Sequence, residues 1–152
     1  MMTNWDLMRD ASRLHLPLVG IYNKDTIPSN NLKNGFYIIN LQDDFDANGN
    51  DLSGTHWTAF QVEGNQAAYF DSFGFRPPIQ VQNFLKPFAP YAYSTKLIQN
   101  VNSGVCGKYV LAFMKFMNSN RQIRSLKQRL MSFVNLFSKN VLKNREILLK
   151  YL

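Results

Sequence analysis

The chain has 152 residues, of which 45% are hydrophobic and 14% aromatic, and this suits one domain, 1–152, with a substantial core rather than a disordered chain. A single cysteine, Cys106, excludes an internal disulfide framework, and the sequence holds no apolar run long enough to cross a membrane. The N-terminal stretch carries Asp6 and Asp10 and lacks a clear apolar signal core, so we expect a protein that is not secreted.

The first two thirds of the chain predict mostly strands. Residues 4–16 predict a short helix ahead of the first strand, and 79–88 predict another helix. Strands are expected where short runs are apolar and rich in aromatic or β-branched residues, or alternate apolar with polar residues. These runs are 35–41, 55–64, 65–74 and 92–100. The dipeptide Gly64-Asn65 predicts a hairpin turn between the second and third runs.

The last third of the chain predicts helices. Residues 105–117 are apolar on almost every face, which is typical of a helix in the middle of a domain. Amphipathic helices are expected at 125–137 and 138–152, with Ser138 as the N-cap of the second. Strands followed by helices predict an α+β fold, with a central mixed sheet packed against a buried helix and surface helices at the C-terminal end. One apolar stripe is expected to face the core: Leu126, Leu130, Phe133 and Phe137.

The net charge of +7 is confined to the C-terminal segment. Residues 1–120 hold nine Lys or Arg and nine Asp or Glu, whereas 121–152 hold eight basic residues and one Glu. Once the apolar stripe faces the core, Arg124, Lys127 and Arg129 are expected to face solvent. A basic helix face suits nucleic acid, but a charged face that only keeps the protein in solution fits the pattern equally well.

Cys106 lies at the start of the predicted buried helix. Free N–H groups and the helix dipole at that end stabilise a thiolate, which is the nucleophilic form of cysteine. Gly104 and Gly107 leave room for a substrate to approach the backbone. The competing interpretation is an inert, buried cysteine, and position alone favours it.

A nucleophilic thiol needs a base, and the chain has two histidines. His15 lies in an apolar stretch and suits a structural role. His56 lies just after a loop at the start of a predicted strand, where catalytic residues often occur. Asp71 is about as far from the hairpin turn as His56 is, so we expect the two to lie opposite each other as a His–Asp pair. The alternative for Asp71 is a simple turn-forming residue.

Attack on a carbonyl group places negative charge on its oxygen. A side-chain amide and a backbone N–H group can stabilise that charge. Gln99 and Asn102 both lie shortly before Cys106, and composition alone does not choose between them.

The segments "GTHWTAF", "YFDSFGF" and "QNVNSGVCG" together resemble the adenain family, the adenovirus maturation proteases. That family shares a clan with the SUMO and ubiquitin-like-protein proteases. Four elements recur in order at compatible spacings, and the resemblance covers residues 18–117, including 18–28, which resemble the stretch before the first core strand of such enzymes. The matching positions are His56-Trp57, Phe70 to Phe75 with the acid at Asp71, Gln99, and Cys106-Gly107, with Asn102-Ser103 also matching.

The resemblance implies a papain-like, adenain-like fold and a thiol endopeptidase that processes capsid precursor proteins during virion maturation. It implies no metal or other cofactor, and a location in the virion and the infected cell. Glycine is expected near the scissile bond, because the narrow channel of the clan admits no side chain there. The implied catalytic residues are Cys106, His56, Asp71 and Gln99, and the implied substrate contacts are Trp57, Asn102 and Gly104. For Trp57, as a wall of the channel, a core aromatic on the strand is an equally good interpretation.

The chain also departs from the adenovirus enzymes. It is shorter, mainly after the cysteine helix, and has Asp71 where they have Glu. Without a second cysteine it cannot hold an activating peptide by a disulfide. It is most similar to the short members found in virophages and Polinton-type elements. Because maturation of this kind takes place beside packed genome, DNA is expected as a partner of the basic C-terminal segment.

Two other functions stay open. An isopeptidase that removes a ubiquitin-like protein uses the same chemistry but needs a broad docking face for that protein. A non-enzymatic, basic nucleic-acid-binding protein leaves Cys106 buried and inert. The small size of the chain and its basic C-terminal segment favour the maturation protease.

Overall fold

The fold is described from a computed structural model, which covers residues 2–28, 32–41, 48, 56–100 and 104–152. The helices are α1 (Asn4–Arg13), α2 (Ile79–Leu85), α3 (Cys106–Ser119), α4 (Leu126–Val134) and α5 (Asn144–Lys150). The 3-10 turns are η1 (Lys86–Phe88) and η2 (Val141–Lys143). The strands are β1 (Leu18–Asn23), β2 (Gly35–Asn40), β3 (Trp57–Glu63), β4 (Gln66–Phe70) and β5 (Ala92–Tyr93).

The strands form one sheet in the order β1-β2-β3-β4-β5. The outer pairs, β1 with β2 and β4 with β5, are parallel, and the inner pairs are antiparallel. Together with the five helices of the described residues, this mixed sheet confirms the predicted α+β fold. Gly64 has a φ of 61° at the turn between β3 and β4, which confirms the predicted hairpin.

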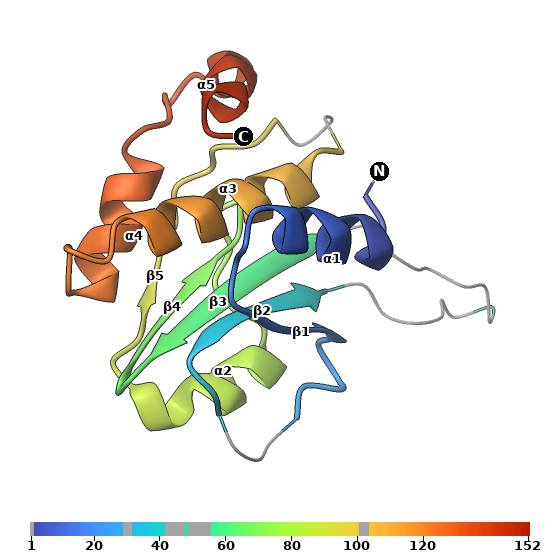
Figure 1. Cartoon of the computed structure of the whole chain (residues 1–152), viewed down its shortest axis with the longest axis vertical. Coiled ribbons are helices and arrows are strands. Elements are labelled where there is room, and N and C mark those ends of the chain that lie inside the picture. Colours follow the sequence, from blue (N-terminus) through green and yellow to red (C-terminus); the bar gives the residue numbers. More distant parts are fainter. Residues whose placement is uncertain (1, 29–31, 42–47, 49–55, 101–103) are drawn as a thin grey trace.

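Helices cover both faces of the sheet (Figure 1). The helices α1, α3 and α4 lie on one face, and α2 lies on the other. The alternation of side chains along β3 and β4 supplies both cores, because neighbouring residues point to opposite faces. Phe70 belongs to the cluster under α3, whereas Tyr69 belongs to the cluster under α2.

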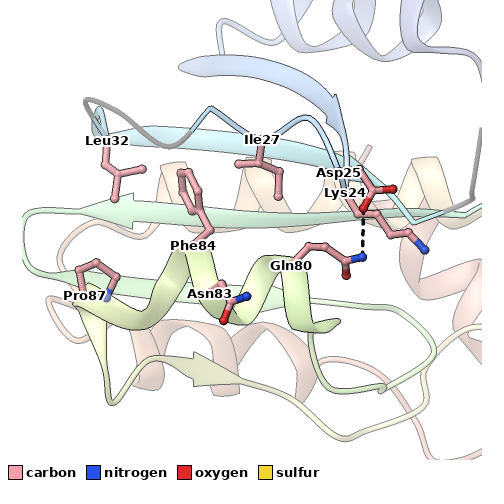
Figure 2. Close-up of a pocket in the computed structure, with 8 residues that line it drawn as sticks. All are labelled: Lys24, Asp25, Ile27, Leu32, Gln80, Asn83, Phe84 and Pro87. Atoms are coloured by element: carbon pink, nitrogen blue, oxygen red, sulfur yellow. Dashed lines mark hydrogen bonds between the residues drawn. The ribbon is translucent and has the colours of Figure 1, made fainter.

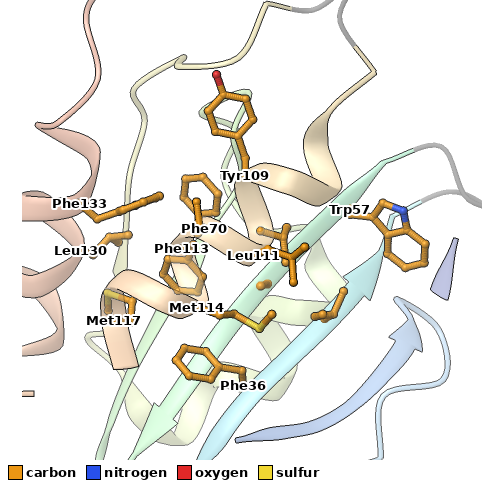
Figure 3. Packing of buried hydrophobic residues seen from close by; sticks show 14 of the residues in the cluster. Phe36, Trp57, Phe70, Tyr109, Leu111, Phe113, Met114, Met117, Leu130 and Phe133 are labelled. Carbon is orange, nitrogen blue, oxygen red and sulfur yellow. The ribbon is translucent and has the colours of Figure 1, made fainter. Parts of the chain in front are cut away.

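The cluster under α3 is the larger of the two (Figure 3). Phe70 of β4 stacks on Phe113 of α3 at a centroid distance of 5.1 Å, and Phe133 of α4 meets Phe70 edge-on at 5.3 Å. All three rings are buried. Helix α3 is therefore the central helix expected from its apolar sequence, and the buried Cys106 at its first residue packs in the same cluster.

The helices α1 and α4 each begin at a side chain that accepts a free backbone N–H group. Thr3 caps α1, because its hydroxyl accepts the N–H of Asp6 at 3.2 Å while the Asp6 carboxylate accepts the N–H of Thr3 at 2.8 Å. Ser125 caps α4 through the N–H of Gln128. The expected stripe on this helix and beyond is buried: Leu126, Leu130, Phe133 and Phe137.

One strand was not predicted, and another was predicted too long. Residues 18–23 form the edge strand β1 and precede the buried strand β2, in the place that the resemblance gave them, but the sequence analysis assigned no strand there. In the expected strand 92–100, only Ala92–Tyr93 pair with β4. The chain then leaves the sheet, because Lys96 reaches α4 and donates to the carbonyl groups of Val134 and Phe137, at 3.0 and 2.6 Å.

Ser138 does not cap a helix. The turn η2 separates it from α5, and Asn140 caps that turn by accepting the N–H of Leu142 at 3.2 Å. Ser138 instead accepts the N–H of Asn140 at 3.0 Å, which is a local turn of the kind that serine favours.

Arg129 does not face solvent, contrary to the prediction from the apolar stripe. Its side chain is 1% exposed and lies 3.2 Å from the Glu63 carboxylate of β3. Its guanidinium group also donates to three carbonyl groups near the end of α3, those of Met117, Arg121 and Ile123, at 3.3, 3.4 and 2.8 Å. Arg124 and Lys127 are exposed as expected. Within the described residues, no helix has the length and apolar character that a membrane crossing requires.

Candidate active site

Three parts of the chain meet at one end of the sheet: the start of β3, the turn after β4 and the start of α3. The backbone N–H of Trp57 donates to the Sγ atom of Cys106 at 3.4 Å. The Nε2 atom of His56 lies 3.0 Å from Oδ1 of Asp71. The structure therefore places the predicted nucleophile, base and acid in one cluster, although Cys106 lies 50 positions after His56 in the sequence.

His56 and Asp71 meet just beyond the end of the hairpin ladder. The last pair of that ladder is Ala59 with Phe70, and Asp71 to Gly74 form a turn. Within this turn, the Phe73 ring stacks on the His56 ring, with centroids 4.5 Å apart and planes 5° from parallel. The hairpin therefore brings the two residues together, but outside its paired positions.

Asp71 forms a turn as well as the His–Asp pair, so both interpretations of this residue hold. Its side chain is buried, and Oδ1 also accepts the N–H of Phe73 at 2.8 Å. Its carbonyl group accepts the N–H of Gly74 at 2.9 Å. Gly74 has a φ of 76°, and a Cβ atom there would lie 2.7 Å from the carbonyl oxygen of Thr95, so only glycine fits. This turn holds the carboxylate in place for His56.

The environment of Cys106 favours the thiolate. Burial by itself raises the pKa of the thiol, but interactions that stabilise the anion outweigh this effect, and the pKa is lowered from its ordinary value. The largest of them comes from the His56 side chain, followed by the N–H of Trp57. The position at the first residue of a 14-residue helix adds the dipole of that helix.

The environment of His56 favours the imidazolium. Burial opposes the charge, but the hydrogen bond to Asp71 and the interaction with Cys106 raise the pKa of His56 to about 9. A carboxylate only accepts hydrogen bonds, so Nε2 carries a proton toward Asp71. The other ring nitrogen, Nδ1, is buried and makes no hydrogen bond of ordinary geometry with the described residues. It is therefore the atom that can exchange a proton with the thiol.

Gln99 lies beside this cluster and is 1% exposed. Its Oε1 atom accepts a short hydrogen bond from the Ser72 hydroxyl. Its backbone N–H donates to the carbonyl group of Ser72 at 3.1 Å. The other amide suggested by the sequence, Asn102, lies outside the described residues, as does Ser103. The role of Gln99 as an oxyanion donor stays a prediction.

The expected substrate contacts differ in exposure. Gly104 is exposed with a φ of 63°, and no atom lies within 4 Å of a Cβ built there, so this glycine leaves open space. Gly107 is covered, because the Met2 side chain comes within 3.0 Å of such a Cβ. Trp57 is 4% exposed, and its indole N–H donates to the carbonyl group of Met2 at 3.0 Å. The wall role predicted for Trp57 remains a prediction.

Sequence reasoning missed three residues of this cluster: Met2, Ser72 and Phe73. Ser72 and Phe73 lie inside the matched motif, directly after Asp71. That pattern was a usable signal. Nothing in the sequence indicates that Met2 reaches the indole of Trp57, which lies 55 positions away.

A separate hollow of about 380 Å³ lies between α2 and the segment after β1 (Figure 2). The Gln80 amide donates to the Asp25 carboxylate at 3.1 Å at one end of it. Its walls contain none of the residues predicted for catalysis. They are Lys24, Asp25, Ile27, Leu32, Gln80, Asn83, Phe84 and Pro87.

No group of three or more His, Cys, Asp or Glu side chains in the described part of the chain is arranged to hold a metal ion. A scan of the chain against protein-family models gives no match, and a search of curated proteins finds none that matches. The residues of the cluster and the sequence motifs are therefore what a functional proposal can use.

Proposed function

We propose that the protein is a cysteine endopeptidase with Cys106 as its nucleophile. The observation that carries the proposal is the position of His56, which bonds Asp71 through Nε2 and interacts with Cys106 at the start of α3. A lowered thiol pKa beside a raised imidazole pKa is the arrangement that cysteine hydrolases need, because it supplies a nucleophile and an acid together. We further propose that the α+β fold is of the papain-like, adenain-like kind.

The chemistry follows from these groups. The Cys106 thiolate attacks the carbonyl carbon of the scissile peptide bond, and the carbonyl oxygen takes the negative charge. His56 gives its Nδ1 proton to the leaving amine as the C–N bond breaks, which leaves a thioester on Cys106. A water molecule then attacks the thioester while His56 takes its proton, and the thiolate is released with the acid product. Asp71 orients the imidazole throughout and does not react.

The amide of Gln99 and the backbone N–H of Cys106 are the proposed donors to the oxyanion. Removing one such donor from an acyl-transfer enzyme costs on the order of 10²–10³ in kcat. Trp57, Asn102 and Gly104 are the proposed substrate contacts. Among them, the described structure leaves open space at Gly104.

The proposed substrate is a viral capsid precursor protein, cleaved near glycine during virion maturation in the infected cell. This part of the proposal depends on the motifs around His56, Asp71 and Cys106 and on their resemblance to the adenain family. The proposed DNA contact of the C-terminal segment now depends on the exposed Arg124 and Lys127, since Arg129 is buried.

The test starts with an activated ester, because it needs no knowledge of the cleavage site. Wild-type protein and Cys106→Ala are mixed with the p-nitrophenyl ester of an N-blocked glycine, and the release of p-nitrophenol is recorded. We expect a burst equal to the enzyme concentration from wild type and none from Cys106→Ala. Candidate capsid precursors are then incubated with both proteins. No burst from the wild type, together with slow alkylation of Cys106 by iodoacetamide, contradicts the proposal.

A further inference from the structure

Ser72 connects the two halves of the proposed active site. It directly follows Asp71, and it is 1% exposed. Its hydroxyl donates to Oε1 of Gln99, and its carbonyl group accepts the backbone N–H groups of Ile98 and Gln99 at 3.0 and 3.1 Å. One residue therefore holds both the backbone and the side chain of the proposed oxyanion donor.

The Ser72 hydroxyl sets the orientation of the Gln99 side-chain amide. A glutamine amide has an oxygen that only accepts and a nitrogen that only donates. Because the Ser72 hydroxyl gives its hydrogen to Oε1, the Nε2 group of Gln99 is directed away from Ser72.

The neighbouring backbone is held by α3 and α5. The carbonyl group of Ile98 accepts the Tyr109 hydroxyl at 3.3 Å and the side-chain amide of Asn144 at 2.9 Å. Tyr109 lies one helical turn after Cys106. On the sheet side, Ser72 follows β4 by two residues, and the N–H of Trp57 at the start of the neighbouring strand β3 binds the Cys106 sulfur. Ser72 and Gln99 are thus tied to the thiol from both the sheet and the helix.

We propose that Ser72 is a positioning residue, which sets the Gln99 amide so that its nitrogen faces the oxyanion formed during attack by Cys106. This role rests on the proposed function. In the proposed active site, the dipeptide Asp71-Ser72 directly follows β4. The Asp71 side chain orients the base His56, and the Ser72 side chain orients the oxyanion donor Gln99.

A purely structural serine and a positioning serine differ in one measurable respect. Acylation of Cys106 by an ester passes through an oxyanion. Alkylation by iodoacetamide does not, because the thiolate displaces iodide from a saturated carbon as the C–S bond forms. A residue that acts through Gln99 affects the first reaction and spares the second.

The experiment compares acylation by the p-nitrophenyl ester of an N-blocked glycine with alkylation by iodoacetamide. The proteins are wild type, Ser72→Ala, Gln99→Ala, the double variant, and the control Ser94→Ala. Ser94 is also buried, and its Oγ accepts only a local backbone N–H, that of Lys96, among its described bonds.

For Ser72→Ala, we expect kcat for acylation to fall about 10- to 100-fold with little change in KM, because small misplacements of a catalytic group have effects of that size. Alkylation is expected to stay within about twofold, on the premise that His56 and Cys106 are untouched. In the Gln99→Ala background, the Ser72 change is expected to have no further effect, since the two residues act as a unit. Ser94→Ala is expected to resemble wild type.

Equal acylation by Ser72→Ala and wild type, or equal losses in both reactions, overturns the positioning role while the protease proposal stands. Additive losses in the double variant overturn it as well. An absent burst from wild type overturns the proposed function itself, and with it this role.

If Ser72→Ala does not fold, Gln99→Glu replaces it. That variant keeps an acceptor for Ser72 but loses the nitrogen donor, so acylation is expected to fall as it does in Gln99→Ala. Full acylation by Gln99→Glu overturns the proposed orientation.

Discussion

The end of the sheet at Cys106 and the basic C-terminal segment, 121–152, handle polar side chains in opposite ways. At the sheet end, buried polar side chains bond mainly to one another: Asp71 to His56, and Ser72 to Gln99. In the C-terminal segment, the buried cation Arg129 bonds mainly to backbone carbonyl groups, and other basic side chains, such as Lys127, extend into solvent.

The two kinds of bonding suit different roles, proton transfer in the first region and stability in the second. Side chains that bond to other side chains can change protonation state together, and the pKa values of His56 and Cys106 shift in opposite directions for that reason. The hydrogen bonds from Arg129 satisfy carbonyl acceptors near the end of α3. Its ion pair with Glu63 connects α4 to β3. The first region is expected to govern turnover, and the second is expected to govern stability.

The largest effect is expected at the nucleophile and the base. Cys106→Ala and His56→Ala are each expected to lower ester acylation at least about 10³-fold, because triad members act as a unit. The thermal midpoint is expected to stay within a few degrees. The matched control for the base is His15→Asn, since His15 is exposed and has a φ of 54°, which asparagine tolerates. Normal turnover in Cys106→Ala contradicts the mechanism.

A smaller effect is expected from Asp71→Asn, because Asp71 orients His56 without reacting. The bond to Asp71 contributes to the raised pKa of about 9 at His56, whose ordinary value is 6.5. The imidazolium of the wild type therefore persists up to about pH 9, and the alkaline limb of the acylation profile is expected there. In Asp71→Asn this limb is expected to move to lower pH.

The acid limb of the same profile reports Cys106. Its lowered pKa means that the thiolate persists below the ordinary thiol value of 9.0 and is lost only as the pH falls through the lower value. Iodoacetamide alkylation across pH measures this directly, and His56→Ala is expected to move the midpoint upward. If the alkaline limb does not move in Asp71→Asn and the acid limb does not move in His56→Ala, the proposed coupling between His56 and Cys106 is contradicted.

The C-terminal segment is expected to respond in stability instead. Arg129→Met removes one of the two arginine partners of Glu63 and takes the guanidinium donors from three carbonyl groups, and we expect a loss of about 3 kcal/mol in the free energy of unfolding. The matched control, Arg124→Met, changes an exposed arginine and is expected to stay within about 0.5 kcal/mol. Urea denaturation measures both. Equal losses in the two variants would show that burial of Arg129 does not matter.

The smallest effect is expected for DNA binding. Arg124→Gln with Lys127→Gln is expected to weaken duplex DNA binding without regard to sequence. The slope of the salt dependence is expected to fall by about one unit for each phosphate that the variant no longer neutralises. Fluorescence anisotropy at low and moderate salt measures this. The exposed pair Lys33→Gln with Lys86→Gln serves as a charge-matched control. If both double variants bind DNA equally weakly, binding depends on the net charge of the protein and not on the face that carries Arg124 and Lys127.

Local sequence alone determined the elements whose signals lie within a few residues. The apolar run of α3 and the hairpin at Gly64 depend on periodicity and turn chemistry, which act over one or two turns of chain. The proximity of Cys106, His56 and Asp71 was also expected from the sequence, because their motifs occur in order and the hairpin brings two of them together.

Only the tertiary structure decided how distant parts of the chain share space. The edge strand β1 forms through its parallel partner β2, and 94–99 leave the sheet because α4 offers Lys96 carbonyl acceptors. Arg129 follows a polar pattern in the sequence, yet three carbonyl groups and Glu63 offset the cost of burying its charge. The bond from Ser72 to Gln99 likewise joins residues 27 positions apart, so no local pattern could predict which end of the amide it fixes.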